Sequence, residues 1–402
     1  MPATLSYPGV YIEEVPSGVR TITGVATSIT AFIGRAKRGP VNKATTITSY
    51  SDFERHFGGL WEHGALGFAV RDFYLNGGST AVIARLFHTD PAATDPDTAT
   101  FDSTTIGLTL SAANQGSWGG DLKVTVDTNV SAAAADDLGV ATADLFNLTV
   151  ADSNTGAVET HRNLTVKESR RRVDRVLKQD SALIRYAGTL DPTSPPTVAA
   201  GTVSAGDASD GLDLAQSDDF TPTNAQLNKK GLFALEQVDL FNMLVIPPYL
   251  AGGNVDTDLI DKAAKYCEQR RAMLIVDAPT AWNSVETAVT QFNSPATDPI
   301  KSRSRNAILY FPRLRQPNPL KDGAVETFAA SGAVAGVIAR TDSRRGVWKA
   351  PAGIDANLVG VAGFSVPLTD GENGRLNPLG VNCLRAFPAA GRVVWGSRTL
   401  RG

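Results

Sequence analysis

The chain has 402 residues, of which 42% are hydrophobic and 20% charged, a composition typical of a globular protein with room for more than one domain. Its formal net charge of −3 gives no general attraction to nucleic acid or to an anionic membrane. The sequence has no apolar run near the roughly 20 residues of a spanning helix, and its first residues do not resemble a secretory signal. The two cysteines, Cys267 and Cys383, form no disulfide framework, which suits assembly in a reducing cytoplasm.

Residues 1–20 are predicted to form an extended N-terminal arm. Within it, residues 10–15 are a short β-branched and aromatic run with Pro and Gly on both sides, which predicts one isolated strand. No hairpin partner lies nearby, so its backbone groups must pair elsewhere. The strand either joins the sheet of a neighbouring subunit or forms an edge of its own domain. The side chains that would make the contact between subunits are Tyr7, Val10, Tyr11, Ile12 and Val15.

Residues 21–89 and 229–402 carry the pattern of one α/β domain. Apolar strands are expected at 28–33, 80–87, 241–246, 272–277 and 306–311, with helices from Ser51, from about Gly64, at 258–271 and at 285–292. Apolar strands separated by helices are typical of a parallel sheet. The predicted fold is therefore mixed α/β, with a partly parallel sheet flanked by helices. A capping box at Ser51 and Glu54 predicts the start of the first helix, and the Gly332-x-x-x-Gly336 spacing predicts close helix packing.

Residues 90–228 differ in composition and are predicted to form an inserted, β-rich surface domain. Alternating stretches at 106–110, 122–126 and 145–150 indicate antiparallel strands with one solvated face. A second capping box, Thr165 with Glu168, predicts a helix from Thr165. The basic run 170–175 is interleaved with acidic residues, which favours a solvated helix face over a nucleic-acid site. Residues 191–228, rich in Pro, Ser, Thr, Gly and Asp, are expected to be a flexible linker.

A charged and aromatic segment near residue 345 is the candidate interface. It contains Arg340, Asp342, Arg345, Trp348 and Lys349. A phosphate site is disfavoured, because no Gly-rich loop opening a helix lies beside it. Arg and Trp are frequent anchors of protein interfaces, so we expect subunit contact here. The alternative is a solvated charged loop.

The sequence contains no recognisable catalytic or metal-binding motif. The four histidines, His56, His63, His88 and His161, lie in no metal-binding spacing, and neither a nucleophile elbow nor a phosphate-binding Gly motif is present. Asp277 follows a predicted parallel strand, where an α/β enzyme could place a carboxylate. Without a partner motif, a structural role is expected for it, and no catalytic residue, metal or cofactor is predicted.

The chain resembles the contractile tail sheath family, which covers phage tail sheaths and the sheaths of phage-tail-like injection systems. The residues that carry the resemblance occur in the same order along the chain, at 8–18, 27–28, 31–36, 39–40, 47–49, 52–54, 57–59, 76–78, 238–242, 246–248, 267–271, 331–336, 340–342, 345–353, 376–382 and 393–400. They include Pro8-Gly9-Val10-Tyr11 and Trp395-Gly396-Ser397-Arg398. The predicted insertion, residues 90–228, carries no resemblance to this family.

The resemblance implies a structural subunit that polymerises helically around an inner tube and contracts to drive the tube outward. It implies a homopolymer of stacked rings, an inner tube protein, and baseplate and terminator or cap proteins as partners, with no nucleic acid and no membrane insertion. Particles would assemble in the cytoplasm and leave by lysis. A non-contractile tail or capsid protein and an α/β hydrolase-like enzyme are the alternatives. Family members continue past residue 400 into a further α/β domain, so the natural product is expected to be longer or to need a companion chain.

Overall fold

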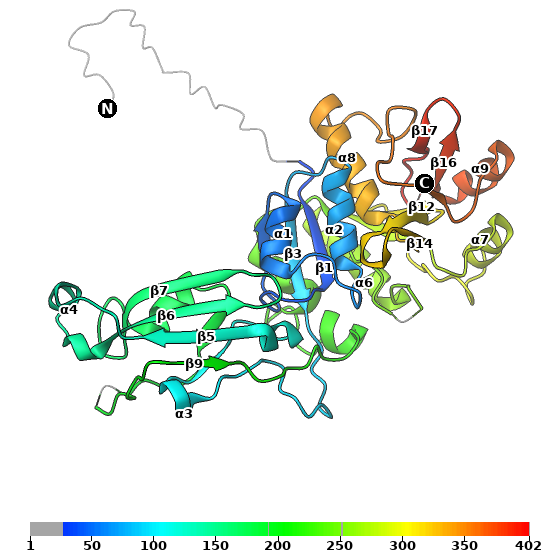
Figure 1. Ribbon diagram of the computed structural model, residues 1–402. Helices are drawn as coiled ribbons and strands as arrows, with labels where there is room; N and C mark the ends of the chain where they lie inside the picture. The colour runs from blue at the N-terminus through cyan, green and yellow to red at the C-terminus, as the bar shows by residue number, and fades with distance from the viewer. Residues whose placement is uncertain (1–26, 192, 251, 402) are drawn as a thin grey trace, which may run out of the picture.

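The computed structural model describes residues 27–191, 193–250 and 252–401. The arm residues Tyr7, Val10, Tyr11, Ile12 and Val15 lie outside the described residues. Two lobes are visible in Figure 1, a larger α/β lobe and an elongated inserted lobe to one side of it.

An eight-stranded sheet forms the centre of the larger lobe, in the order β17-β16-β12-β11-β10-β1-β3-β2. The strands are β1 (Thr30–Arg35), β2 (Thr45–Ile47), β3 (Ala81–Leu86), β10 (Met243–Val245), β11 (Met273–Asp277), β12 (Ala307–Phe311), β16 (Val381–Phe387) and β17 (Gly391–Val394). All neighbouring pairs from β16 to β3 are parallel, while β17 and β2 pair antiparallel at the two edges. The predicted fold class, a largely parallel sheet in a mixed α/β domain, is confirmed.

Helices cover both faces of this sheet. One face carries α1 (Tyr50–Phe57), α2 (Leu66–Leu75) and α8 (Ser331–Arg345), and the other carries α6 (Thr257–Arg270), α7 (Val285–Phe292) and α9 (Asp370–Leu376). Alternate residues of a strand feed the two cores, so Phe32 packs under α2 while Ala31 and Ile33 pack on the opposite side. Because both faces are buried, the strands are mainly apolar, with buried exceptions that include Arg85 in β3 and Asn382 and Arg385 in β16.

The predicted close helix packing is present between α2 and α8. A Cβ atom at Gly332 would stand 2.2 Å from the carbonyl oxygen of Ala69, and one at Gly336 would stand 2.4 Å from that of Phe73. Any side chain at these two positions would collide with the backbone of α2, which is why glycine is required there.

The inserted lobe has its own antiparallel sheets and its own core. Its elements are β5 (Leu122–Asp127), β6 (Leu145–Asp152), β7 (Val158–Thr165), β9 (Gly201–Ser204), β4 (Leu110–Ala112), β8 (Ile184–Tyr186), α3 (Ser103–Ile106), α4 (Ala132–Leu138) and α5 (Val173–Asp180). Burial alternates along β5, with Leu122, Val124 and Val126 facing the core. This is the expected sheet with one solvated face.

The remaining elements are a small sheet and several short helices. The sheet contains β13 (Leu314–Asn318), β14 (Ala324–Phe328) and β15 (Gly363–Phe364). The short helices are Ser117–Asp121, Thr142–Asp144, Gln216–Phe220, Gly231–Gln237, Pro319–Lys321 and Asn377–Leu379.

Both predicted capping boxes were placed wrongly. Helix α1 is capped by Ser49, whose Oγ accepts from the backbone N–H of Asp52, and not by Ser51. Thr165 is the last residue of β7 and pairs with Leu145, so α5 begins only at Val173. Both four-residue patterns are present in the sequence. In the first case a neighbouring serine caps the helix, and in the second case Thr165 pairs in a strand. The alternating stretch 106–110 was predicted to be a strand. In the structure Ile106 is the last residue of α3, and β4 begins only at Leu110.

The stretch 191–228 is not simply a linker. It contains β9 and the helical turn Gln216–Phe220, and Leu214 and Phe220 are buried in the core of the larger lobe. The division of the chain into domains stays a prediction, and this packing favours an earlier end for the insertion. The backbone N–H of Leu212 donates to the carbonyl of His88 at 2.9 Å, so the two ends of the lobe lie side by side at these residues.

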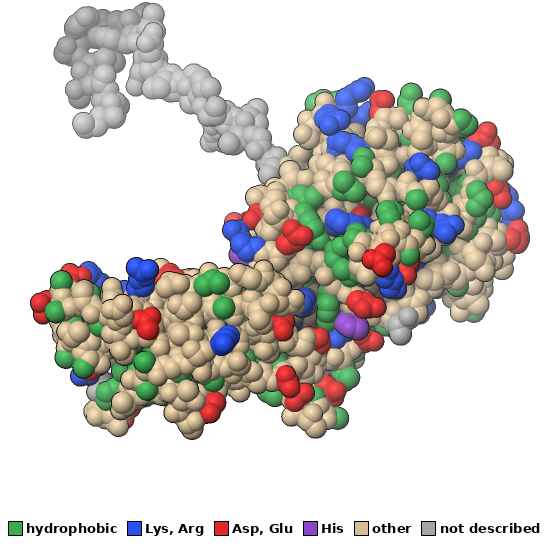
Figure 2. All heavy atoms as spheres, in the orientation of Figure 1, with side chains coloured by type: hydrophobic (Ala, Val, Ile, Leu, Met, Phe, Trp, Pro, Cys, Tyr) green, Lys and Arg blue, Asp and Glu red, His purple; other side chains and the backbone are tan. Residues whose placement is uncertain are grey.

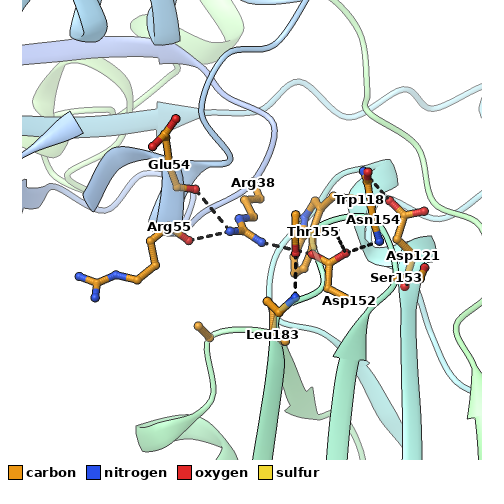
Figure 3. Close-up of polar contacts among 12 residues, drawn as sticks. Arg38, Glu54, Arg55, Trp118, Asp121, Asp152, Ser153, Asn154, Thr155 and Leu183 are labelled. Carbon is orange, nitrogen blue, oxygen red and sulfur yellow. Dashed lines mark hydrogen bonds and ion pairs between the residues drawn. The ribbon is translucent and has the colours of Figure 1, made fainter. Parts of the chain in front are cut away.

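Arginines of the larger lobe hold the inserted lobe at its base. Arg38 lies 3.6 Å from the Asp152 carboxylate, stands over the Trp118 ring, and donates to the carbonyl of Arg55 at 2.9 Å (Figure 3). Arg85 is buried and donates to backbone carbonyls on both sides of the junction, including that of Gln115 at 2.9 Å. The junction is therefore polar and directional, whereas each lobe has an apolar interior.

Candidate interaction surface

The predicted interface residues lie at the end of α8 and in the turn that follows it. Arg340, Asp342 and Arg345 belong to the last turns of α8, and Trp348 and Lys349 follow the helix end at Gly346. Lys and Arg side chains gather over α8 at the top of the larger lobe in Figure 2. The structure thus brings the five predicted residues into one region. Their role as an interface stays a prediction.

A groove of about 440 Å³ opens beside this turn, at the amino ends of the parallel strands. We call it the Trp348 groove. Its lining is mainly apolar and includes Met243, Met273, Ile308, Tyr310, Ile338, Val347, Trp348 and Pro351. Met243 and Met273 are the first residues of β10 and β11, so the sheet edge itself forms part of the lining. Burial raises the pKa of Tyr310, which keeps its hydroxyl neutral. The charged residues in the lining are Asp342 and Lys349.

Trp348 is the exposed side chain that marks this groove. It is 86% exposed and the neighbouring Val347 is 61% exposed, while the other four tryptophans of the chain are buried or half-buried. A tryptophan gains more from burial than most side chains, and exposed apolar groups beside a groove are typical of binding surfaces. This geometry supports Trp348 as a contact residue.

Asp342 fixes the start of the described chain at the same groove. Its carboxylate accepts a hydrogen bond from Ser28 Oγ at 2.5 Å, and the backbone N–H of Ile29 donates to Asn242 Oδ1 at 3.0 Å. Ser28 has a left-handed backbone, with a φ of 65°, and also lines the groove. Residues 1–26 therefore join the larger lobe at the rim of the Trp348 groove.

Two of the predicted cations serve their own lobe. Arg340 donates to the carbonyls of Asn76 and Asn357, which ties α8 to the end of α2. Burial, together with the nearby charge of Arg344, lowers the pKa of Arg340. Lys349 Nζ donates to the carbonyls of Ala350 and Ala352 and so shapes the turn. These contacts are structural.

The remaining cations are directed toward solvent. Arg345 pairs loosely with Asp355 at 3.5 Å, with both side chains more than half exposed, and Arg344 is exposed. Sequence reasoning missed the apolar groove beside them. Met243, Met273 and Ile308 look like ordinary core positions, and no local signal shows that a strand end remains uncovered.

At the carboxyl ends of the strands, where an α/β enzyme would bind its substrate, two charged side chains make internal contacts. Asp277 accepts from the backbone N–H groups of Ala330 and Ser331 at 2.7 and 2.8 Å and from Ser331 Oγ at 2.6 Å, so it caps α8. Arg313 nearby donates to the carbonyls of Ala278 and Gly253. The structural role expected of Asp277 is confirmed.

Within the described residues, no group of His, Cys, Asp and Glu side chains could hold a metal ion. Across the same ranges, no helix has the length and apolarity needed to cross a membrane. The basic run 170–175 lies in ion pairs with Asp137, Glu168 and Asp174, as expected for a solvated face.

Comparison with known proteins supports one family. The family described as phage tail sheath protein central domain matches residues 201–400. The fold is similar to that of a sheath tail protein from Listeria innocua, with a TM-score of 0.57 and 15% identity over 94% of this chain and 71% of that one. It is also similar to a sheath tail protein from Desulfitobacterium hafniense, with a TM-score of 0.54 and 16% identity over 98% of this chain and 76% of that one. No curated protein matches the sequence.

Proposed function

The chain belongs to the phage tail sheath family, and from this premise we propose that it polymerises helically around an inner tube and contracts to drive the tube outward. The match over residues 201–400 carries the proposal, and the α/β fold shared with two sheath tail proteins supports it. The role proposed is structural, with no catalytic residue, metal or cofactor. The particle would be a phage tail or a tail-like injection system that assembles in the cytoplasm and is released by lysis.

Helical assembly requires one surface of a subunit to bind a different surface of the next. Such head-to-tail contacts extend without limit when their rotation does not close a ring. The Trp348 groove, with Arg344 and Arg345 beside it, supports one of these surfaces, because it combines exposed apolar area with unburied cations. The predicted arm, with Tyr7, Val10, Tyr11, Ile12 and Val15, would supply the link to a neighbour.

Contraction requires two packings of the same subunits. A two-state population moves from 1:99 to 99:1 with about 5.5 kcal/mol, so a small preference in each contact, added over a polymer, makes the change effectively irreversible. The rigid, doubly covered sheet of the larger lobe would move as one body, while the arms keep neighbours connected. A baseplate would hold the extended state, and terminator proteins would cap the polymer.

Electron microscopy of the purified chain tests this proposal. We expect striated tubes that are shorter and wider after treatment with a mild denaturant than before it. Deleting residues 1–15 should leave a folded subunit but abolish long tubes. Tubes of constant length under every condition would instead indicate a non-contractile tail protein, and full-length tubes from the deletion variant would contradict the role given to the arm.

A further inference from the structure

We propose that, in the unassembled subunit, residues 10–15 of the same chain occupy the Trp348 groove and keep it covered until assembly. This inference rests on the proposed function only in naming assembly as the event that releases the segment. The occupancy itself is a property of the single subunit and can be measured on it.

An occupant is favoured by the exposed apolar side chains beside the groove. Trp348 and Val347 are 86% and 61% exposed, and Ile354, beyond the same turn, is 68% exposed. Monomeric proteins rarely leave such a patch uncovered, since apolar area buried contributes about 25 cal/mol per Å². A free subunit with this surface open would associate unspecifically.

Residues 10–15 have the chemistry that the groove would recognise. Their sequence, Val10-Tyr11-Ile12-Glu13-Glu14-Val15, combines four apolar or aromatic side chains with two adjacent carboxylates. The groove has a mainly apolar lining, in which Asp342 and Lys349 are the charged residues. Apolar side chains would enter the groove while the carboxylates remain in solvent.

The covalent connection to the larger lobe keeps residues 10–15 within a short length of chain from the groove. The chain enters at Ser28, on the groove rim, where Asp342 holds its hydroxyl. Residues 16–27 form the tether, which spans at most about 40 Å when extended and can also fold back. A connection of this length gives an effective concentration on the order of mM, far above that of a second subunit in dilute solution. Docking within one chain is therefore favoured before assembly.

The consequence is a competition between two sites for one segment. Residues 10–15 cannot cover their own groove and join a neighbouring subunit at the same time. In dilute solution the tether favours the groove. At the end of a growing polymer, neighbouring surfaces are equally local and can take the segment, which uncovers Trp348 for the next contact.

Fluorescence quenching tests the proposal on the monomeric subunit. A bimane label is placed at position 12 in an Ile12→Cys variant, since tryptophan quenches bimane on contact. Cys267 and Cys383 do not compete, because both are buried and burial raises the pKa of each thiol to about 12. We expect strong quenching that does not change on dilution. Adding Trp348→Phe should increase emission several-fold.

The matched control is Trp395→Phe, which alters a half-buried tryptophan that does not line the groove and should leave the quenching intact. Quenching that persists unchanged in Trp348→Phe, or no quenching at all, would overturn the proposal. Quenching that disappears on dilution would overturn it in favour of docking from a second copy. Tube formation is scored separately by microscopy, so failure here and failure of the proposed function are distinguishable.

Discussion

The two lobes of this protein reach stability by different routes. In the larger lobe a parallel sheet is buried on both faces, and α2 and α8 approach so closely that only glycine fits between them. In the inserted lobe an antiparallel sheet keeps one face in solvent, and the lobe joins its neighbour through polar contacts of Arg38 and Arg85. The difference suggests that the larger lobe is the rigid unit of an assembly, while the inserted lobe is an addition to its surface.

Excision of the inserted lobe is the most severe test of this comparison. Replacing residues 89–211 by a short Gly/Ser linker should preserve cooperative unfolding, because His88 and Leu212 already lie side by side. Extending the deletion to residue 228 also removes Leu214 and Phe220 from the main core, and one buried Phe is worth about 3–5 kcal/mol. Urea denaturation followed by circular dichroism compares the two variants. Loss of cooperative unfolding in the shorter deletion would show that the lobes form one folding unit.

The close contact between α2 and α8 at Gly332 can be tested by substitution. Gly332→Ala should reduce the free energy of unfolding by about 1–3 kcal/mol, because the new Cβ meets the backbone of α2. Gly374→Ala in α9 is the matched control, since nothing lies within 4 Å of a Cβ there. It should be neutral, or stabilising by up to about 1 kcal/mol. Equal effects of the two substitutions on the urea midpoint would refute the packing argument.

The cap of α8 tests whether the carboxyl ends of the strands are structural. Asp277→Ala removes the acceptor for three hydrogen bonds and should cost about 2 kcal/mol of stability. Asp277→Asn keeps an oxygen acceptor and should cost less. Thermal melting of both variants gives the comparison. An alanine variant as stable as the parent protein would mean that Asp277 is retained for another purpose.

The junction should show the smallest effect. Arg38→Ala should cost about 1 kcal/mol, because the Arg38–Asp152 pair is partly shielded from solvent. We expect faster hydrogen exchange around residues 152–155 and little change in the main sheet, measured by mass spectrometry. Arg175→Ala, which removes an exposed pair with Glu168, is the control and should change neither. A matching increase in exchange throughout the central sheet would contradict a local junction.

The sequence predicted the candidate site only in part. Trp348 and its neighbouring charges stood out by composition, because Trp and Arg together are unusual in a solvated loop. The groove beside them could not be predicted, since Met243 and Met273 are apolar in the same way as any buried strand residue. Whether they line a groove depends on what covers the strand ends, and no short stretch of sequence records that.

Local errors had a similar origin. Ser51 and Thr165 each head a correct four-residue capping pattern, but Ser49 caps α1 and Thr165 pairs with Leu145 in a strand. The insertion was predicted to run to residue 228 on composition alone, although Leu214 and Phe220 pack in the other lobe. A polar, Gly-rich stretch resembles a linker even where two of its side chains enter a core.

The sequence by itself determined the apolar strands, the surrounding helices and the close packing at Gly332 and Gly336. A strand buried on both faces is mainly apolar, as in residues 273–276, and two helices in backbone contact need small residues one turn apart, as at Gly332 and Gly336. Only the tertiary structure decided the strand order, the edges and the open groove. Thr30 pairs with Met243 across the whole insertion, and such long-range pairing depends on the packing of complete elements. A local pattern specifies which residues must be buried, but the assembled fold decides what buries them.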